Sequence, residues 1–120
     1  MHIYSFEKLD VWKEAIQLAV KTYKITDLYP SKEKFGLISQ MRRCSVSVSS
    51  NIAEGTARLT NKDKAHFMTI AYSSSLELLN QTIISKELDF ISEDNYKNIR
   101  LDLESITNKI NALRNHFLNS

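Results

Sequence analysis

Apolar residues recur at intervals of three and four along four long stretches of the chain. The clearest case is the last stretch, where seven positions keep this spacing: Tyr96, Ile99, Leu103, Ile106, Ile110, Leu113 and Phe117. Such spacing places the side chains on one face of an α-helix. The pattern predicts four helices, over residues 6–27, 32–54, 62–88 and 93–118.

Local signals predict where these helices begin and end. The pair Tyr29-Pro30 ends the first helix, because the residue before proline avoids helical dihedral angles. Ser31 and Ser92 are expected N-caps of the second and fourth helices, and Thr60 or Asn61 of the third. Gly55 is expected to end the second helix in the left-handed conformation that glycine adopts most easily.

Turn-forming residues are rare in the chain, which has only two glycines and one proline among 120 residues. Few turn formers favour long elements with short connections. Residues 1–120 are therefore expected to form a single all-α domain. Its predicted architecture is an antiparallel, up-down-up-down four-helix bundle.

The apolar residues also predict which helix faces are buried. The second helix is expected to bury a face that includes Ile38, Met41, Val48 and Ile52. The third helix is apolar on two sides, which indicates a central position or an oligomer interface. The first helix is expected to bury a broad face composed of Leu9, Trp12, Ile16, Ala19 and Tyr23, widened by Val11, Ala15 and Leu18.

A line of polar residues runs beside the apolar face of the second helix, within an arc of roughly 80° at about 100° per residue. A second polar line lies on the third helix. We expect the two lines to form a structural hydrogen-bond ladder, with Arg43 paired to Glu77 because buried charges need partners. A catalytic role is disfavoured, since no nucleophile–base set accompanies them. The expected ladder comprises Gln40, Arg43, Ser47, Asn51, Glu54, Ser74 and Glu77, with Gln81 beside it.

The chain is close to electrical neutrality, with 16 basic and 14 acidic side chains and a formal charge of +2. Charge alone therefore does not identify a nucleic-acid-binding protein. Basic residues nevertheless cluster after Gly55, where only Asp63 opposes them. Two interpretations stay open: ordinary solvated charge, or a surface that contacts phosphates. The candidate phosphate contacts are Arg42, Arg58, Lys62, Lys64 and Arg100.

The sequence offers no familiar catalytic, metal or cofactor motif. Cys44 is the single cysteine, which excludes an internal disulfide and a multi-cysteine zinc site. No Glu is followed by His three residues on, as bundle di-iron sites require. Two glycines cannot build a phosphate-cradling loop. We expect no cofactor, no metal, no enzymatic activity and no membrane span, and we expect a cytoplasmic location.

Motifs spread over nearly the whole chain resemble those of one protein family. They are Leu9-x-Val-Trp with Ala15, Pro30-x-x-Glu33, Gln40-x-Arg-Arg, Ser47-x-x-Ser-Asn-Ile-Ala-Glu-Gly with Arg58, and Ser74-x-x-Glu77-Leu. The chain thereby resembles the four-helix-bundle proteins encoded in intervening sequences of bacterial 23S ribosomal RNA genes. The family's recurrent polar positions correspond here to Arg43, Ser47, Asn51, Glu54 and Glu77.

The resemblance implies a small bacterial bundle, typically a ring-shaped homopentamer, with no enzymatic activity attached. A relative of this family, the accessory variability determinant of diversity-generating retroelements, is a more basic pentamer that binds nucleic acid and a reverse transcriptase. Two functions therefore remain in view. The protein is expected to be a nucleic-acid-associated accessory protein, or else a structural scaffold that engages a protein partner without binding RNA or DNA.

Overall fold

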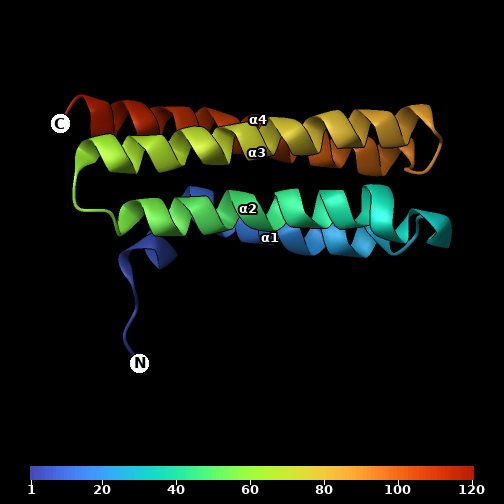
Figure 1. Ribbon diagram of the computed structural model, residues 1–120, viewed down its shortest axis with the longest axis horizontal. Helices are drawn as coiled ribbons and strands as arrows, with labels where there is room; N and C mark the ends of the chain where they lie inside the picture. Colours follow the sequence, from blue (N-terminus) through green and yellow to red (C-terminus); the bar gives the residue numbers. More distant parts are fainter.

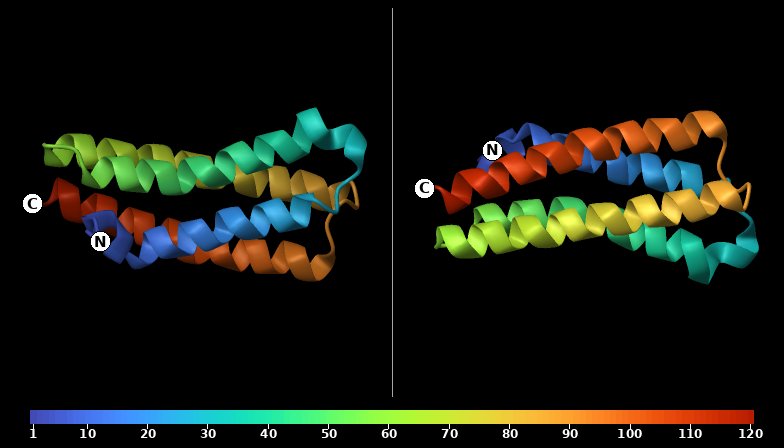
Figure 2. Two further views of the ribbon diagram at one scale, coloured as in Figure 1. Left: turned by 90° about the horizontal axis from the view of Figure 1, so that it is seen from below. Right: turned by 90° about the horizontal axis from the view of Figure 1, so that it is seen from above.

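The computed structural model describes residues 1–120 and consists of four antiparallel helices in one bundle. The helices are α1 (Asp10–Thr26), α2 (Ser39–Thr56), α3 (Asn61–Glu87) and α4 (Glu93–Leu118). In Figure 1, α1 and α2 form one layer and α3 and α4 the other, and both chain termini lie at the same end. Figure 2 shows α4 returning beside α1, which closes the up-down-up-down arrangement. The predicted fold class is confirmed.

The start of α1 differs from the prediction, because the helix begins at Asp10 and not near residue 6. A short 3₁₀ turn (η1, Ser5–Lys8) precedes it, and Leu9 adopts an extended conformation between the two, with φ −77° and ψ 126°. The carboxylate of Glu7 accepts a hydrogen bond from the Tyr4 amide at 2.7 Å, which stabilises the separate turn.

The region before α2 also differs from the prediction of one helix from residue 32. It contains a 3₁₀ turn (η2, Ser31–Glu33) and an irregular wide turn (η3, Lys34–Ile38). Gly36 breaks the helical path there, with φ −107° and ψ −115°, and the Glu33 carboxylate accepts a hydrogen bond from the Leu37 amide. The regular helix therefore starts only at Ser39.

Gly55 does not end α2 in a left-handed conformation, as no glycine has a positive φ. It is buried within the last turn of the helix, which runs to Thr56. A Cβ atom at Gly55 would lie 2.6 Å from Met68 Cε and 2.8 Å from Phe67 Cβ. The glycine thus allows α2 and α3 to approach closely.

The ends of α3 and α4 follow the sequence signals. Thr60 accepts a hydrogen bond from the Asp63 amide and Ser92 accepts one from the Asn95 amide, each at 3.1 Å. Both residues are therefore N-caps, which satisfy backbone donors that have no partner inside the helix. Asp89, in the turn between the two helices, has a positive φ of 59°.

One apolar core runs through the bundle. The predicted buried faces of α2 and of most of α4 are confirmed. The face of α1 is partly wrong, because Ile16 and Tyr23 are exposed and Thr22 is buried in their place. The core side chains include Val11, Ala15, Leu18, Ile25, Tyr29, Met41, Cys44, Val48, Ile52, Met68, Ala71, Leu78, Tyr96, Ile99, Leu103, Ile106 and Ile110.

Candidate functional site

Polar side chains meet along the groove between α2 and α3. The hydroxyls of Ser47 and Ser74 are 2.9 Å apart and link the two helices. Asn51 donates to the Ser47 hydroxyl at 3.0 Å and to the Ser47 carbonyl at 2.8 Å. These three residues, all half-buried, were among those proposed for a ladder from the sequence. They form one continuous hydrogen-bonded group.

The expected ion pair between Arg43 and Glu77 does not form. The Arg43 guanidinium donates instead to the Gln40 side chain, one helical turn earlier. Both Arg43 and Glu77 are exposed to solvent, so neither charge is forced to find an ionic partner. Glu54 is exposed as well. The predicted ion pair was expected because both charges would be buried, and neither is.

Glu77 contacts Cys44. From the sequence, Cys44 was expected only to widen the apolar face of the second helix. The Cys44 thiol donates a hydrogen bond to Glu77 Oε2 at 2.9 Å. Gln81 Nε2 donates to the Cys44 sulfur at 3.5 Å, and the buried Gln81 Oε1 has no hydrogen-bond partner. Burial, reinforced by the Glu77 carboxylate, raises the pKa of Cys44 to about 11. Such a thiol is a poor nucleophile and a poor metal ligand at neutral pH.

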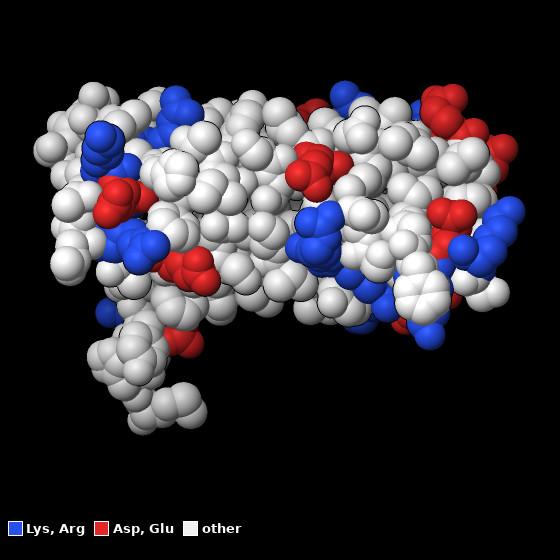
Figure 3. All heavy atoms as spheres, in the orientation of Figure 1, with Lys and Arg blue, Asp and Glu red and all other residues white.

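Three of the five candidate phosphate contacts gather at the end of the bundle that carries the loop from α2 to α3. They are Arg58, Lys62 and Lys64, from the loop and the first turn of α3. The Arg58 guanidinium lies 4.4 Å from the centre of the Phe67 ring, and Lys64 Nζ lies 5.6 Å from that of Phe117. On the face drawn in Figure 3, Lys and Arg side chains are visible at this end with acidic ones between them, and others lie toward the opposite end.

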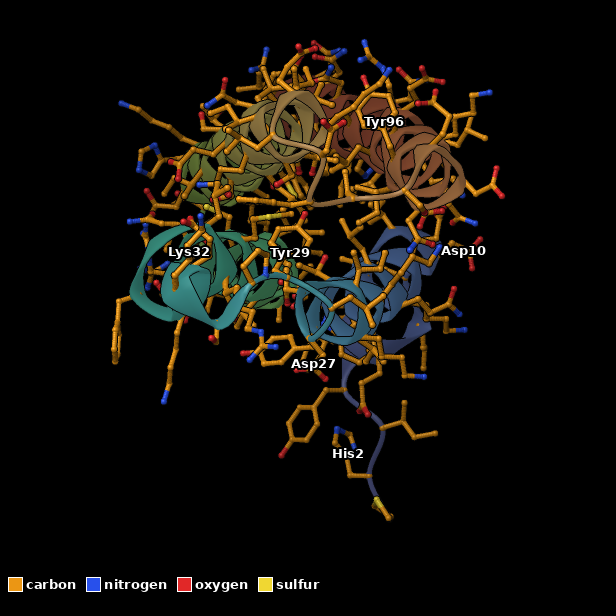
Figure 4. All side chains as sticks on the ribbon, turned by 90° about the vertical axis from the view of Figure 1, so that its right-hand side faces the viewer. His2, Asp10, Asp27, Tyr29, Lys32 and Tyr96 are labelled. Atoms are coloured by element: carbon orange, nitrogen blue, oxygen red, sulfur yellow. The ribbon has the colours of Figure 1, made fainter.

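Arg42 does not belong to this cluster, because it is held against α1 near the opposite end. Its guanidinium donates to Asp27 at 2.7 Å and to the Thr26 hydroxyl at 2.9 Å, and lies 4.7 Å from the centre of the Tyr23 ring. Figure 4 shows Asp27 and Tyr29 at this end of the bundle. Arg42 therefore has a structural role between α1 and α2.

Arg100 lies apart from the cluster too, in the first half of α4. It donates to the Tyr96 hydroxyl at 2.6 Å. The five basic residues proposed from the sequence therefore do not form one surface. Helix periodicity assigns a residue to a face, but it does not show how far along the bundle two residues on different helices lie from each other.

Charged contacts between α1 and α4 were missed by the sequence analysis. Glu14 accepts hydrogen bonds from Ser105 at 2.6 Å and from Lys109 at 2.5 Å. Burial opposes ionisation of Glu14, but these two donors outweigh it and lower the pKa of the carboxyl. Lys21 forms an ion pair with Asp102 at 2.5 Å. Spacings along one helix carry no signal for these partners, which lie over 80 residues apart in the sequence.

The arrangement offers little for metal chemistry. No three His, Cys, Asp or Glu side chains lie close enough together to hold a metal ion. None of the helices combines the length and the apolar character required to cross a membrane.

Comparison with known proteins agrees with the fold. Curated protein sequences give no significant match. Among solved structures, the chain is similar to a protein of unknown function from the S23 ribosomal protein family of Bacteroides thetaiotaomicron, with a TM-score of 0.78 and 20% identity. The match covers 87% of this chain and 97% of that one. At this identity the likeness shows the fold alone. The family model described as 23S rRNA-intervening sequence protein matches residues 7–112, nearly the whole chain, and the protein belongs to that family.

Proposed function

We propose that the protein is a non-enzymatic, homo-oligomeric accessory protein of the cytoplasm that associates with nucleic acid. The observation that carries this proposal is the cluster of Arg58, Lys62 and Lys64 at one end of the bundle. Family membership supports an association with ribosomal RNA genes or their transcripts. Cations presented beside aromatic rings suit a phosphate backbone, which attracts basic side chains without regard to sequence.

The local charge pattern differs between the two ends of the bundle. Acidic side chains follow one another around the α3–α4 turn at the opposite end, namely Glu87, Asp89, Glu93 and Asp94. Lysines lie at that end as well, and Lys86 forms an ion pair with Glu93 at 3.5 Å. The local cluster of Arg58, Lys62 and Lys64, rather than a net charge difference between the ends, is therefore what would attract a phosphate.

Salt-dependent binding tests the proposal. Fluorescence anisotropy with structured RNA and with duplex DNA is measured at about 50 and 200 mM salt; neutralising three phosphates predicts a roughly 40-fold loss of affinity for duplex DNA over this range. The charge reversals Arg58→Glu and Lys62→Glu are expected to weaken binding at low salt. The matched control is Lys32→Glu, which changes an exposed lysine at the opposite end of the bundle, the end that faces the viewer in Figure 4. Absence of binding at low salt would contradict the proposal.

We propose further that the protein self-associates, as the homopentamer that its resemblance to the 23S rRNA-intervening sequence proteins implies. Apolar side chains remain exposed on both outer layers, which supports association between copies. Ile16, Val20 and Tyr23 of α1 lie on one layer, and Leu76 and Ile83 of α3 on the other. A ring would repeat the basic cluster around its axis and add to nucleic-acid affinity. Light scattering tests this, and a monomer at all concentrations would contradict it.

The same exposed apolar residues favour the second candidate, a structural scaffold that engages another protein. Its binding would depend on apolar contacts and only weakly on salt. Val20→Lys is expected to abolish such binding while it leaves nucleic-acid affinity unchanged. If nucleic acid does not bind at low salt, this scaffold role becomes the better account.

A further inference from the structure

An open hollow of about 280 Å³ lies at the end of the bundle that carries the basic cluster. The N-terminal turn, Leu9 just before α1, and residues of α2, α3 and α4 meet there, because both chain termini and the α2–α3 loop share this end (Figure 1). The volume is near the lower end of pockets that take organic ligands. Its lining consists of Ser5, Leu9, Thr56, Lys64, Leu113, His116 and Phe117.

The lining combines an apolar wall with polar and cationic groups. Leu9, Leu113 and Phe117 are half-buried and pack against the core of the bundle. The His116 ring is exposed, with its centre 5.8 Å from that of the Phe117 ring. Lys64 Nζ lies 5.6 Å from the centre of the same ring. No acidic side chain lines the hollow.

We propose that this hollow binds an unstacked base of single-stranded nucleic acid while Lys64 and the neighbouring Arg58 and Lys62 contact the flanking phosphates. The inference rests on the proposed nucleic-acid association and adds the form of the ligand. Proteins that bind single strands place bases against aromatic side chains and hold the backbone with cations. A duplex keeps its bases stacked inside, so it would reach the cations but leave the hollow empty.

The chemistry also explains why the apolar wall remains open to solvent. Phe117 packs against the core but is only half-buried, so part of its ring remains accessible beside His116. A base can stack on such a surface whatever its identity, because every base has a π-face. The site is therefore expected to prefer single strands without strong sequence preference.

The test uses the full chain and three probes, namely a short single-stranded RNA that contains one 2-aminopurine, the same strand in a duplex, and AMP. Phe117→Leu keeps an apolar side chain but removes the aromatic face, and His116→Ala changes an exposed side chain of α4. Thermal unfolding verifies that each variant is folded. Lys32→Gln, at the opposite end, is the control.

We expect single-strand affinity to fall at least about fivefold in Phe117→Leu, with duplex affinity changed by less than about twofold. The 2-aminopurine fluorescence should change on binding to the wild-type protein and not on binding to the variant. AMP that competes with the strand would indicate that one nucleotide suffices, while AMP that does not compete would indicate that the strand is the ligand. Equal single-strand affinities for wild type and both variants would overturn the inference and leave the proposed function standing. Failure of the wild type to bind any nucleic acid would overturn both.

Discussion

The thiol of Cys44 in α2 donates a hydrogen bond to the carboxylate of Glu77 in α3 across 2.9 Å. Cys44 is buried and Glu77 is exposed, so the contact runs from the core to the rim of the groove. A neutral thiol can donate to a carboxylate, but a thiolate would meet a like charge there. The contact therefore favours the protonated thiol, and the pKa of Cys44 rises to about 11.

The first prediction concerns the ionisation of this thiol. We expect the thiolate absorbance of the folded protein to appear with a midpoint near pH 11. Tyrosines also ionise in this range, so the titration of Cys44→Ala is subtracted from that of the wild type to leave the signal of the thiol. Glu77→Gln should move the midpoint to lower pH, because it removes a negative charge beside the sulfur. An unchanged midpoint in Glu77→Gln would show that burial acts alone.

Protein stability should follow the same ionisation. The unfolded thiol loses its proton near pH 9.0, whereas the folded thiol keeps it until about 11. Between these values the folded state binds more protons than the unfolded state, so the free energy of unfolding falls as the pH rises. The fall should be smaller in Cys44→Ala. Tyrosines and lysines also ionise in this pH range, so the difference between the two proteins gives the contribution of Cys44 alone.

The neighbouring arginines of α2 should differ in their effect on stability. Arg42 donates to Asp27 and to the buried Thr26, whereas Arg43 contacts only Gln40 on its own helix. We expect Arg42→Gln to lower the free energy of unfolding by about 1–2 kcal/mol, since it removes a charged hydrogen bond that joins α1 to α2. Arg43→Gln, the matched control, should change it by less than about 0.5 kcal/mol.

Denaturant unfolding of the two variants distinguishes this structure from the arrangement expected from the sequence. That arrangement paired Arg43 with a buried Glu77 and would make Arg43 the costly position. A large loss in Arg43→Gln together with a small one in Arg42→Gln would contradict the contacts described here.

The fold could be predicted because its main signals are local or periodic. The seam of α4 recurs at three and four, and five of its seven residues, from Tyr96 to Ile110, are buried. Thr60 and Ser92 cap their helices because an N-cap is decided within four residues. The face of α1 that is buried could not be predicted from such signals. Apolar residues surround most of that helix, so contact with α2 and α4 decides that Leu18 is buried and Ile16 is exposed.

The candidate site was predicted less well, for a different physical reason. The sequence placed Ser47 and Asn51 on one face, and short side chains on a face stay where the backbone puts them. Arg42 and Arg43 have long side chains that reach several partners, and solvent competes for their charge. Their partners depend on the relative position of two helices, which no spacing within one helix encodes.

Gly55 provides a test of the close approach between α2 and α3. Alanine is favoured over glycine within a helix by about 1 kcal/mol. At this position, however, its methyl group would lie 2.8 Å from Phe67 Cβ, an atom that cannot move without the backbone of α3. Overpacking typically costs about 1–3 kcal/mol, and the helix preference of alanine offsets about 1 kcal/mol of it. We therefore expect Gly55→Ala to lower the free energy of unfolding by up to about 2 kcal/mol.

The control for Gly55→Ala is Ser50→Ala, which lies on the exposed side of the same helix. It should change the free energy of unfolding by less than about 0.5 kcal/mol. Higher stability in Gly55→Ala than in wild type, measured by thermal unfolding, would mean that α3 can move away and that the close approach is not required.

The last prediction concerns Glu14, which joins α1 to α4 through Ser105 and Lys109. These donors lower the pKa of the Glu14 carboxyl below its value of 4.5 in the unfolded chain. As the pH falls, the unfolded chain therefore takes up a proton at Glu14 before the folded protein does. The contribution is therefore complete above the unfolded pKa and is lost as the pH falls through the lower folded pKa. Because the pair is partly exposed, we expect Glu14→Gln to cost about 0.5–1 kcal/mol at pH 7.

This cost of Glu14→Gln should shrink in acid. The control is Glu104→Gln, which changes an exposed carboxylate of α4 without an ion pair and should cost little at either pH. A cost for Glu14→Gln that stays constant down to strongly acidic pH would show that packing of the side chain, and not its charge, holds α1 against α4.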